Sequence, residues 1–149
     1  METKKSLFNS CSPEDTEGLG ERFSKTLSPG SRVGLVGELG AGKTSFVRGI
    51  ARGLGAEGAV KSPSYAILNI YEGGRLPLYH IDLYRLNTVA EFHDAGLGEY
   101  FFGIGVCVVE WADSVPQVLG ECDAVVRFSW RSETLREIAI NEGFNKEAG

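Results

Sequence analysis

Hydrophobic residues recur with the period of a helix in the N-terminal part of the chain. Leu19, Phe23 and Leu27 fall on one helical face. The segment 12–15, Ser-Pro-Glu-Asp, is typical of a helix start, with a Ser cap, a Pro in the first turn and an acid three residues after the cap. The segment 28–30, Ser-Pro-Gly, ends the pattern. We therefore predict an amphipathic helix between these two signals.

A second helical stripe follows a short apolar run. The run Val-Gly-Leu-Val predicts a β-strand over about 32–36. After a glycine-rich connection, hydrophobic residues again recur at helical spacing and form a stripe of Phe46, Val47, Ile50 and Leu54. Gly53 and Gly55 end this helix. The pattern predicts a strand–loop–helix unit whose helix turns this stripe toward the core.

Beyond residue 64 the pattern changes to that of strands. Two segments rich in aromatic and β-branched residues, 65–71 and 76–82, are separated by Glu-Gly-Gly-Arg at 72–75, which is typical of a hairpin turn. Pro77 indicates that one side of its strand is not hydrogen-bonded at that position.

Further strands follow in the C-terminal half. The continuous apolar run 104–109 predicts a fully buried strand that ends at Glu110. Hydrophobic and polar residues alternate over 124–130 and 135–140, which predicts a final antiparallel hairpin. A short helix is expected from Asn87 or Thr88 to Phe92. The fold class is therefore α/β, a single domain with a mixed parallel and antiparallel sheet flanked by helices. The parallel part is expected around the strand at 32–36.

The strand–loop–helix unit contains a phosphate-binding motif. Residues 37–44 fit G-x-x-x-x-G-K-[ST] and are Gly37, Glu38, Leu39, Gly40, Ala41, Gly42, Lys43 and Thr44. Glycines let successive backbone N–H groups turn toward a phosphate, and the following helix adds the positive end of its dipole. Lys43 is expected to reach the terminal phosphates and Thr44 to ligate Mg²⁺. A chance match of this length is rare, on the order of one per cent, so the motif predicts a P-loop NTPase.

Length, composition and charge narrow the class of protein. The 149 residues, 42% hydrophobic and 23% charged, are those of one ordinary globular domain. We expect poorly ordered tails over 1–10 and 142–149. The formal net charge of −5 argues against a protein that binds nucleic acid by itself through phosphate contacts. No apolar run has the length of a membrane span, the N-terminus does not resemble a signal peptide, and the three cysteines lack metal-type spacing. These features predict a cytoplasmic protein.

A P-loop needs an acid at the end of a neighbouring strand to hold Mg²⁺, directly or through water. Glu110 follows the buried strand, as a Walker B acid does, although Glu replaces the usual Asp; Asp82 also lies at a strand end. His80 and Asp82 point to the same face of their strand, and we expect a hydrogen-bonded pair there rather than a zinc site. The hydroxyl-rich loop 61–65 is either a sensor of the γ-phosphate or an ordinary connection containing a proline.

Together these motifs resemble the bacterial TsaE (YjeE) family. The resemblance rests on G-E-L-G-A-G-K-T, S-P-S-Y, Y-H-I-D-L-Y-R-L and V-E-W-A-D in this order, and it extends from about Leu19 to Asp113 and weakly to Arg136. It implies the small ATPase subunit of the machinery that makes N6-threonylcarbamoyladenosine in tRNA. The implied partners are TsaB and TsaD, with slow ATP hydrolysis by the isolated subunit and an indirect relation to tRNA.

The resemblance also implies roles for individual residues. Lys43 and Thr44 match the phosphate and Mg²⁺ positions, Glu110 the Mg²⁺-associated acid, and Asp82 a second acid needed for hydrolysis. The implied catalytic residues are thus Asp82, Glu110 and Lys43. Three further residues are implied to contact the nucleotide: Trp111, Thr16 and Arg136. The chain departs from the family in reading Ser-Pro-Ser-Tyr at 62–65 where members usually read S-P-T-[FY], which keeps the hydroxyl.

Two other functions remain compatible with a P-loop. A small-molecule kinase shares ATP binding but normally has an arginine-rich lid and an acceptor pocket, for which 149 residues leave little room. A regulatory module that binds ATP without significant hydrolysis would be distinguished by the absence of phosphate release in the presence of its partner. A GTPase is disfavoured because no [NT]-K-x-D motif is found.

Overall fold

A computed structural model describes residues 4–38, 40–56, 59–61 and 68–142. Its elements, in chain order, are β1 (Lys4–Ser10), α1 (Pro13–Ser24), β2 (Arg32–Gly37), α2 (Lys43–Leu54), β3 (Ala59–Lys61), β4 (Leu68–Tyr71), β5 (Leu78–Asp82), α3 (Val89–Asp94), α4 (Gly98–Phe101), β6 (Val106–Glu110), a 3₁₀ turn (Ala112–Ser114), α5 (Pro116–Gly120), β7 (Ala124–Trp130) and β8 (Arg136–Glu142). The predicted caps are present. Ser12 accepts a hydrogen bond from the Asp15 amide at 3.0 Å, and Thr88 and Glu91 form a capping box at the start of α3.

The strands form one eight-stranded sheet in the order β1-β8-β7-β2-β6-β5-β4-β3. The central strands β7, β2, β6 and β5 are parallel to one another, whereas β1, β8, β4 and β3 pair antiparallel. The expected mixed sheet, parallel around the P-loop strand, is confirmed. Parallel strands end at the same edge, so the carboxyl ends of β5, β6, β2 and β7 lie together.

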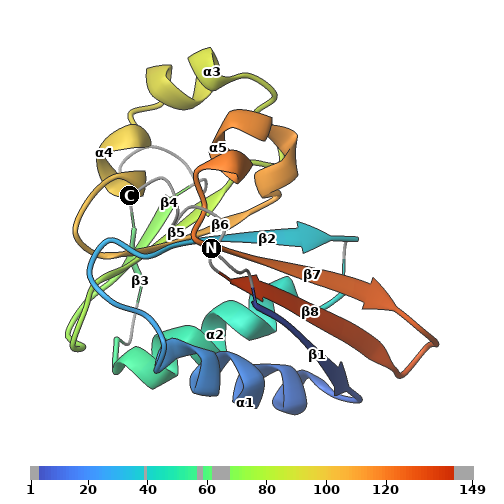
Figure 1. Cartoon of the computed structure of the whole chain (residues 1–149). Coiled ribbons are helices and arrows are strands. Elements are labelled where there is room, and N and C mark those ends of the chain that lie inside the picture. The colour runs from blue at the N-terminus through green and yellow to red at the C-terminus, as the bar shows by residue number, and fades with distance from the viewer. Residues whose placement is uncertain (1–3, 39, 57–58, 62–67, 143–149) are drawn as a thin grey trace.

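Helices cover both faces of the sheet, giving three layers (Figure 1). On one face α1 and α2 pack their apolar stripes against the strands; this core contains Leu19, Phe23, Phe46, Val47, Ile50, Leu54, Val33, Leu35, Val126, Phe128, Ile138 and Ile140. The opposite core lies under α3, α4 and α5 and contains Ile81, Leu83, Phe92, Phe101, Cys107, Val109, Val115, Val118 and Val125. The stripe predicted for α2 is therefore confirmed as the face that holds this helix to the sheet.

The two helices of the first layer approach so closely that side chains are excluded between them. A Cβ on Gly49 of α2 would lie 2.0 Å from the Glu17 carbonyl oxygen of α1, and one on Gly20 would lie 2.3 Å from the Phe46 carbonyl oxygen. At the exposed rim of this contact, Arg52 of α2 donates hydrogen bonds to Glu21 at 2.7 Å and to Glu17 at 3.2 Å, both on α1. The position of α2, which begins at the P-loop, is thus fixed by α1.

The structure corrects the expected N-terminal tail. Residues Lys4–Ser10 form β1, an edge strand that pairs antiparallel with β8 from Lys4↔Glu142 to Ser10↔Arg136. Phe8 packs on the core while Leu7 is exposed, so the strand has too few buried hydrophobic residues to give a periodic signal. At the other end Glu142 belongs to β8, and residues 143–149 lie outside the described part of the chain.

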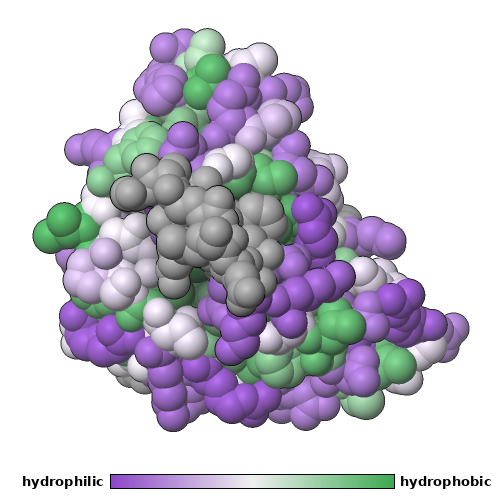
Figure 2. Space-filling view, in the orientation of Figure 1, coloured by the Kyte–Doolittle hydropathy of each residue, from purple (hydrophilic) through white to green (hydrophobic). Residues whose placement is uncertain are grey.

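The face of the molecule drawn in Figure 2 is mainly polar. In Figure 2 hydrophilic residues cover most of the visible described surface, and the hydrophobic ones form separate small groups. Among the residues that the structure describes, no helix is both long enough and apolar enough to cross a membrane.

Candidate functional site

The P-loop connects β2 to α2 at the carboxyl edge of the parallel strands. Gly37, Gly40 and Gly42 have φ of 151°, 77° and 110°, and Gly42 is the left-handed N-cap of α2. No side chain caps this helix among the described residues. The first-turn amides of a twelve-residue helix therefore point out of its N-terminus without a side-chain acceptor, an arrangement that favours a phosphate. Leu39 lies outside the described residues.

The side chain of Lys43 turns back over the loop that precedes it. Its Nζ donates to the carbonyl oxygens of Gly37 at 2.5 Å and Glu38 at 3.1 Å and lies 4.0 Å from the ring centroid of Trp111. Only 5% of the residue is exposed. Burial lowers the pKa of Lys43 below its ordinary value, and the nearby charges of Glu110, Asp113 and Asp82 act in the opposite direction. The lysine is therefore a buried cation surrounded by acids at the edge where the loop opens.

The two predicted acids lie side by side. Asp82 ends β5 and Glu110 ends β6, and the parallel register pairs them directly. Asp82 accepts a hydrogen bond from the Tyr84 amide at 2.9 Å and is half-buried, whereas Glu110 is 8% exposed. Both carboxylates interact electrostatically with Lys43. The sheet order thus brings together three residues that the sequence separates widely.

The expected pairing of His80 with Asp82 is wrong. His80 Nε2 instead lies 2.5 Å from Glu110 Oε2, and both side chains are buried. The reason is the position of β6: it runs beside β5 with His80 opposite Val108, so the Glu110 carboxylate on the adjacent strand reaches the imidazole. Nδ1 of His80 is buried without a hydrogen-bond partner among the described residues. His80 therefore orients the Glu110 carboxylate.

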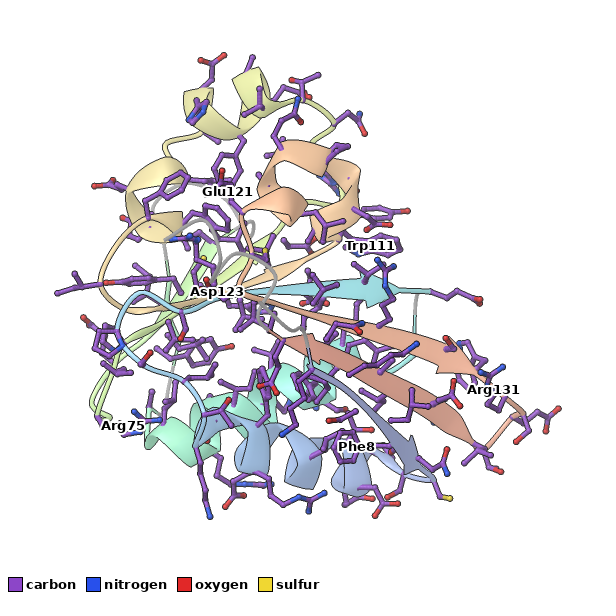
Figure 3. The ribbon with its side chains drawn as sticks, in the orientation of Figure 1. Phe8, Arg75, Trp111, Glu121, Asp123 and Arg131 are labelled. Atoms are coloured by element: carbon purple, nitrogen blue, oxygen red, sulfur yellow. The ribbon has the colours of Figure 1, made fainter. Side chains whose placement is uncertain are left out.

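Trp111 connects the lysine to the surface. With φ 57° and ψ 38°, it is the one non-glycine residue with a positive φ in the described part of the chain. Its ring lies over Lys43 on one side and 5.0 Å, centroid to centroid, from the ring of the exposed Tyr84. Figure 3 shows Trp111 near the carboxyl end of β2, with Asp123 at the opposite end of the sheet. Strained conformations of this kind persist where neighbouring residues hold them and are common at functional sites.

Thr16 lies against the P-loop from the side of α1. It is 1% exposed, and its hydroxyl lies 2.6 Å from that of Ser10 at the end of β1. A Cβ on Gly42 would be 3.5 Å from Thr16 Cγ2 and 3.6 Å from its hydroxyl oxygen. The hydroxyl is thus already bonded within the protein, and Thr16 supports the loop from behind.

Arg136 approaches the same loop from β8. Its Nη2 lies 3.5 Å from the Gly40 carbonyl oxygen, at the outer limit of a hydrogen bond, and its guanidinium carbon lies 4.0 Å from the ring centroid of Trp130. The structure therefore places Thr16 and Arg136, the two implied residues from the ends of the chain, beside the P-loop.

A cavity of about 580 Å³ opens beside the loop. It is lined by Val36, Gly37, Glu38, Trp111, Asp113, Arg127, Phe128 and Ser129. Clefts at the carboxyl ends of parallel strands are where open α/β sheets bind their ligands. The lining combines two aromatic rings, those of Trp111 and Phe128, with charged and hydroxyl groups.

The oxygen donors near the loop are of the kind that Mg²⁺ binds. Among the described residues no group of three or more His, Cys, Asp or Glu is arranged to hold a metal ion. Mg²⁺ is usually held by one or two protein oxygens together with phosphate oxygens and water. Thr44, exposed in the first turn of α2, and Glu110 are the residues suited to that role.

The loop 62–65 lies outside the described residues, so neither of its two interpretations is tested. Asp113 and Trp130 were not predicted. The acid follows Glu110 by three positions, which is a usable local signal, whereas Trp130 reaches the loop only through the sheet order.

Sequence comparisons relate the chain to known proteins. A sequence model described as "Threonylcarbamoyl adenosine biosynthesis protein TsaE" matches residues 10–138. The chain is 43% identical over 143 residues to the Bacillus subtilis tRNA threonylcarbamoyladenosine biosynthesis protein TsaE, covering 96% of this chain and 89% of that protein. It is 41% identical over 131 residues to the protein of the same name from Treponema pallidum, covering 88% and 96%.

A solved structure is also similar. The crystal structure of Bacillus subtilis YdiB superposes with a TM-score of 0.75 at 33% sequence identity, covering 98% of this chain and 90% of that one. The likeness therefore extends over the whole sheet and both helical layers.

Proposed function

The chain belongs to the TsaE family, and we propose that it is a Mg²⁺-dependent ATPase that acts with TsaB and TsaD in forming N6-threonylcarbamoyladenosine in tRNA. The observation that carries the proposal is the P-loop with its buried Lys43 next to the paired strand ends of Asp82 and Glu110. These are the parts that phosphoryl transfer to water requires: a phosphate cradle, a cation and acids for the metal.

The position of each residue determines its proposed role. The amides of the loop and of the first turn of α2 bind phosphate oxygens, and Lys43 exchanges its contacts with the Gly37 and Glu38 carbonyls for the β- and γ-phosphates. Thr44 and Glu110 would hold Mg²⁺, and the ion would neutralise charge on the phosphates. His80 keeps the Glu110 carboxylate in place, and Asp82 orients water at the γ-phosphate.

The arrangement favours a slow enzyme when the protein is alone. Fast P-loop hydrolysis needs a cationic group that meets the charge developing on the γ-phosphate. Arg85, the internal candidate, is exposed on the turn after β5. We infer that the TsaB–TsaD pair supplies this group or orders the segment 82–86 around the nucleotide.

The test measures Mg-ATP binding and steady-state phosphate release for the protein alone and with purified TsaB–TsaD. We expect a slow basal rate and a stimulation of up to the roughly 10³–10⁵-fold that an added cationic group gives. Lys43→Ala should abolish binding. Glu110→Gln should retain binding and lose roughly 10²-fold in hydrolysis, whereas Glu99→Gln, an exposed acid on α4, serves as the matched control.

Three results would contradict the proposal. Unchanged ATP affinity in Lys43→Ala would remove the P-loop from the function. Phosphate transferred to an added small-molecule acceptor, with no release to water, would indicate a kinase; binding without phosphate release in the presence of TsaB–TsaD would indicate a regulatory module.

A further inference from the structure

Trp130 extends the hydrophobic row of β7 beyond the core to the P-loop. Val126 and Phe128 alternate with Trp130 along the strand and are buried against the α1–α2 layer. On β8, Ile140 and Ile138 form the matching row, and Arg136 follows them at the same spacing. Both rows therefore emerge on the α1–α2 face and continue past the core, where they reach the loop.

The turn between the strands fixes Trp130 and Arg136 opposite each other. They are direct partners in the antiparallel register, and the Arg131 amide donates to the Leu135 carbonyl at 2.8 Å immediately beyond them. Ser132 accepts from the Thr134 and Leu135 amides within the turn. A tight turn of this kind sets the register of a hairpin, so the guanidinium is held over the indole at 4.0 Å.

This stacked pair touches the loop from two sides. Arg136 Nη2 approaches the Gly40 carbonyl, and a Cβ on Gly40 would lie 3.8 Å from Trp130 Cζ2. A Cβ on Gly42 would lie 3.8 Å from Arg136 Cδ. Arg136 Nε is buried and has no hydrogen-bond partner among the described residues. The indole therefore takes the place of an anion in holding the guanidinium.

We propose that Trp130 is a positioning residue for nucleotide binding: it holds Arg136 against Gly40 and thereby keeps the P-loop open for the triphosphate. This inference rests on the proposed ATPase function. The indole lies on the outside of the loop, so its effect passes through Arg136 and the backbone of Gly40. Loss of this contact should weaken the binding of ATP and of inorganic triphosphate equally, because the pair acts on the part of the loop that binds phosphate.

The experiment measures dissociation constants of Mg-ATP and of magnesium triphosphate by calorimetry for a set of variants. Trp130→Leu keeps apolar volume but loses the aromatic face, and Trp130→Phe keeps a face. Arg136→Met removes the charge. Arg131→Met is the matched control, since Arg131 lies on the same hairpin (Figure 3) and pairs there with Glu137, and it has no hydrogen bond or ion pair with the described residues of the loop.

We expect Trp130→Leu and Arg136→Met each to weaken both ligands roughly three- to tenfold, which is the range of a cation–π contact. The double variant should be no weaker than the worse single one, because each change breaks the same contact. Trp130→Phe should recover most of the affinity, and Arg131→Met should match the wild type. All variants should unfold within a few degrees of the wild type, since the pair lies outside the core.

Three results would overturn the inference: wild-type affinity in Trp130→Leu, multiplication of the two single effects in the double variant, or weakening for ATP with none for triphosphate, which would make the pair a surface for the nucleoside. If Lys43→Ala also bound both ligands normally, the proposed function itself would fail, so the two failures are distinguishable.

Discussion

At the scale of single residues, Lys43 combines burial with the charge that phosphate binding needs. Its pKa is lowered because desolvation outweighs the attraction of Glu110, Asp113 and Asp82. In the free protein the charged form is therefore disfavoured relative to a lysine in water. Such a residue is expected to lower stability for the sake of function.

We predict that Lys43→Met, measured without nucleotide, unfolds at a temperature equal to or above that of the wild type although it no longer binds ATP. The sign follows from linkage: the folded-state pKa lies below the unfolded one, so the unfolded protein binds more protons between the two values. The advantage of the variant should be full below the lowered pKa of Lys43 and should shrink as the pH rises through that pKa toward the value of the unfolded chain. Thermal unfolding from neutral to alkaline pH checks this; a clear loss of stability at neutral pH would show that the contacts with Gly37 and Glu38 dominate.

Individual site residues could be predicted from sequence when their relation is local. The P-loop is one continuous segment, so spacing alone identifies Lys43 and its neighbours. His80 was assigned the wrong carboxylate because its partner comes from the neighbouring strand β6, and no spacing along β5 contains that information. Sequence spacing does not identify Trp130 for the same reason, since this residue meets Arg136 and Gly40 only through the hairpin and the sheet order.

At the scale of elements, the contact between α1 and α2 fixes the start of the helix that follows the P-loop. Gly49→Ala should lower the free energy of unfolding by about 1–3 kcal/mol, because its Cβ would lie 2.0 Å from the Glu17 carbonyl oxygen and the backbones must separate. For a chain of this size the melting temperature should fall by roughly 2–12 °C.

Gly18→Ala on α1 is the control for that substitution. Its Cβ would meet only the end of the Arg22 side chain at 3.9 Å. With free space available, the higher helix propensity of alanine should add up to about 1 kcal/mol of stability. Equal melting temperatures for the two variants would mean that the helices separate without cost.

The elements that sequence patterns predicted are those with their own hydrophobic period. The stripe of α2 and the alternation of β7 and β8 each identify a buried face, and all three elements are present. The strand β1 exists because β8 offers it a hydrogen-bonding edge, and β3 has only three residues. Edges of this kind are properties of the assembled sheet, so a local pattern does not contain them.

At the scale of the whole molecule, the charge limits what the protein binds unaided. A formal net charge of −5 repels a polyanion. We predict that the isolated protein binds tRNA more weakly than about 10⁻⁴ M at physiological salt, the weak limit of ordinary non-specific binding. Fluorescence anisotropy of labelled tRNA, with and without TsaB–TsaD, measures this. Tight binding to the isolated protein would indicate a direct tRNA contact.

The pairing of β1 with β8 also constrains how the protein is made. β1 leaves the ribosome before the other strands of the sheet, but its hydrogen-bonding partner, residues 136–142, is translated after them. Ser10, which meets the Thr16 hydroxyl, and Arg136, which reaches Gly40, are then brought together across β1 and β8. A nascent or prematurely terminated chain that contains the entire P-loop motif still lacks this closing step. The contact of Arg136 with the P-loop therefore forms only after β8 has been translated and has paired with β7 and β1.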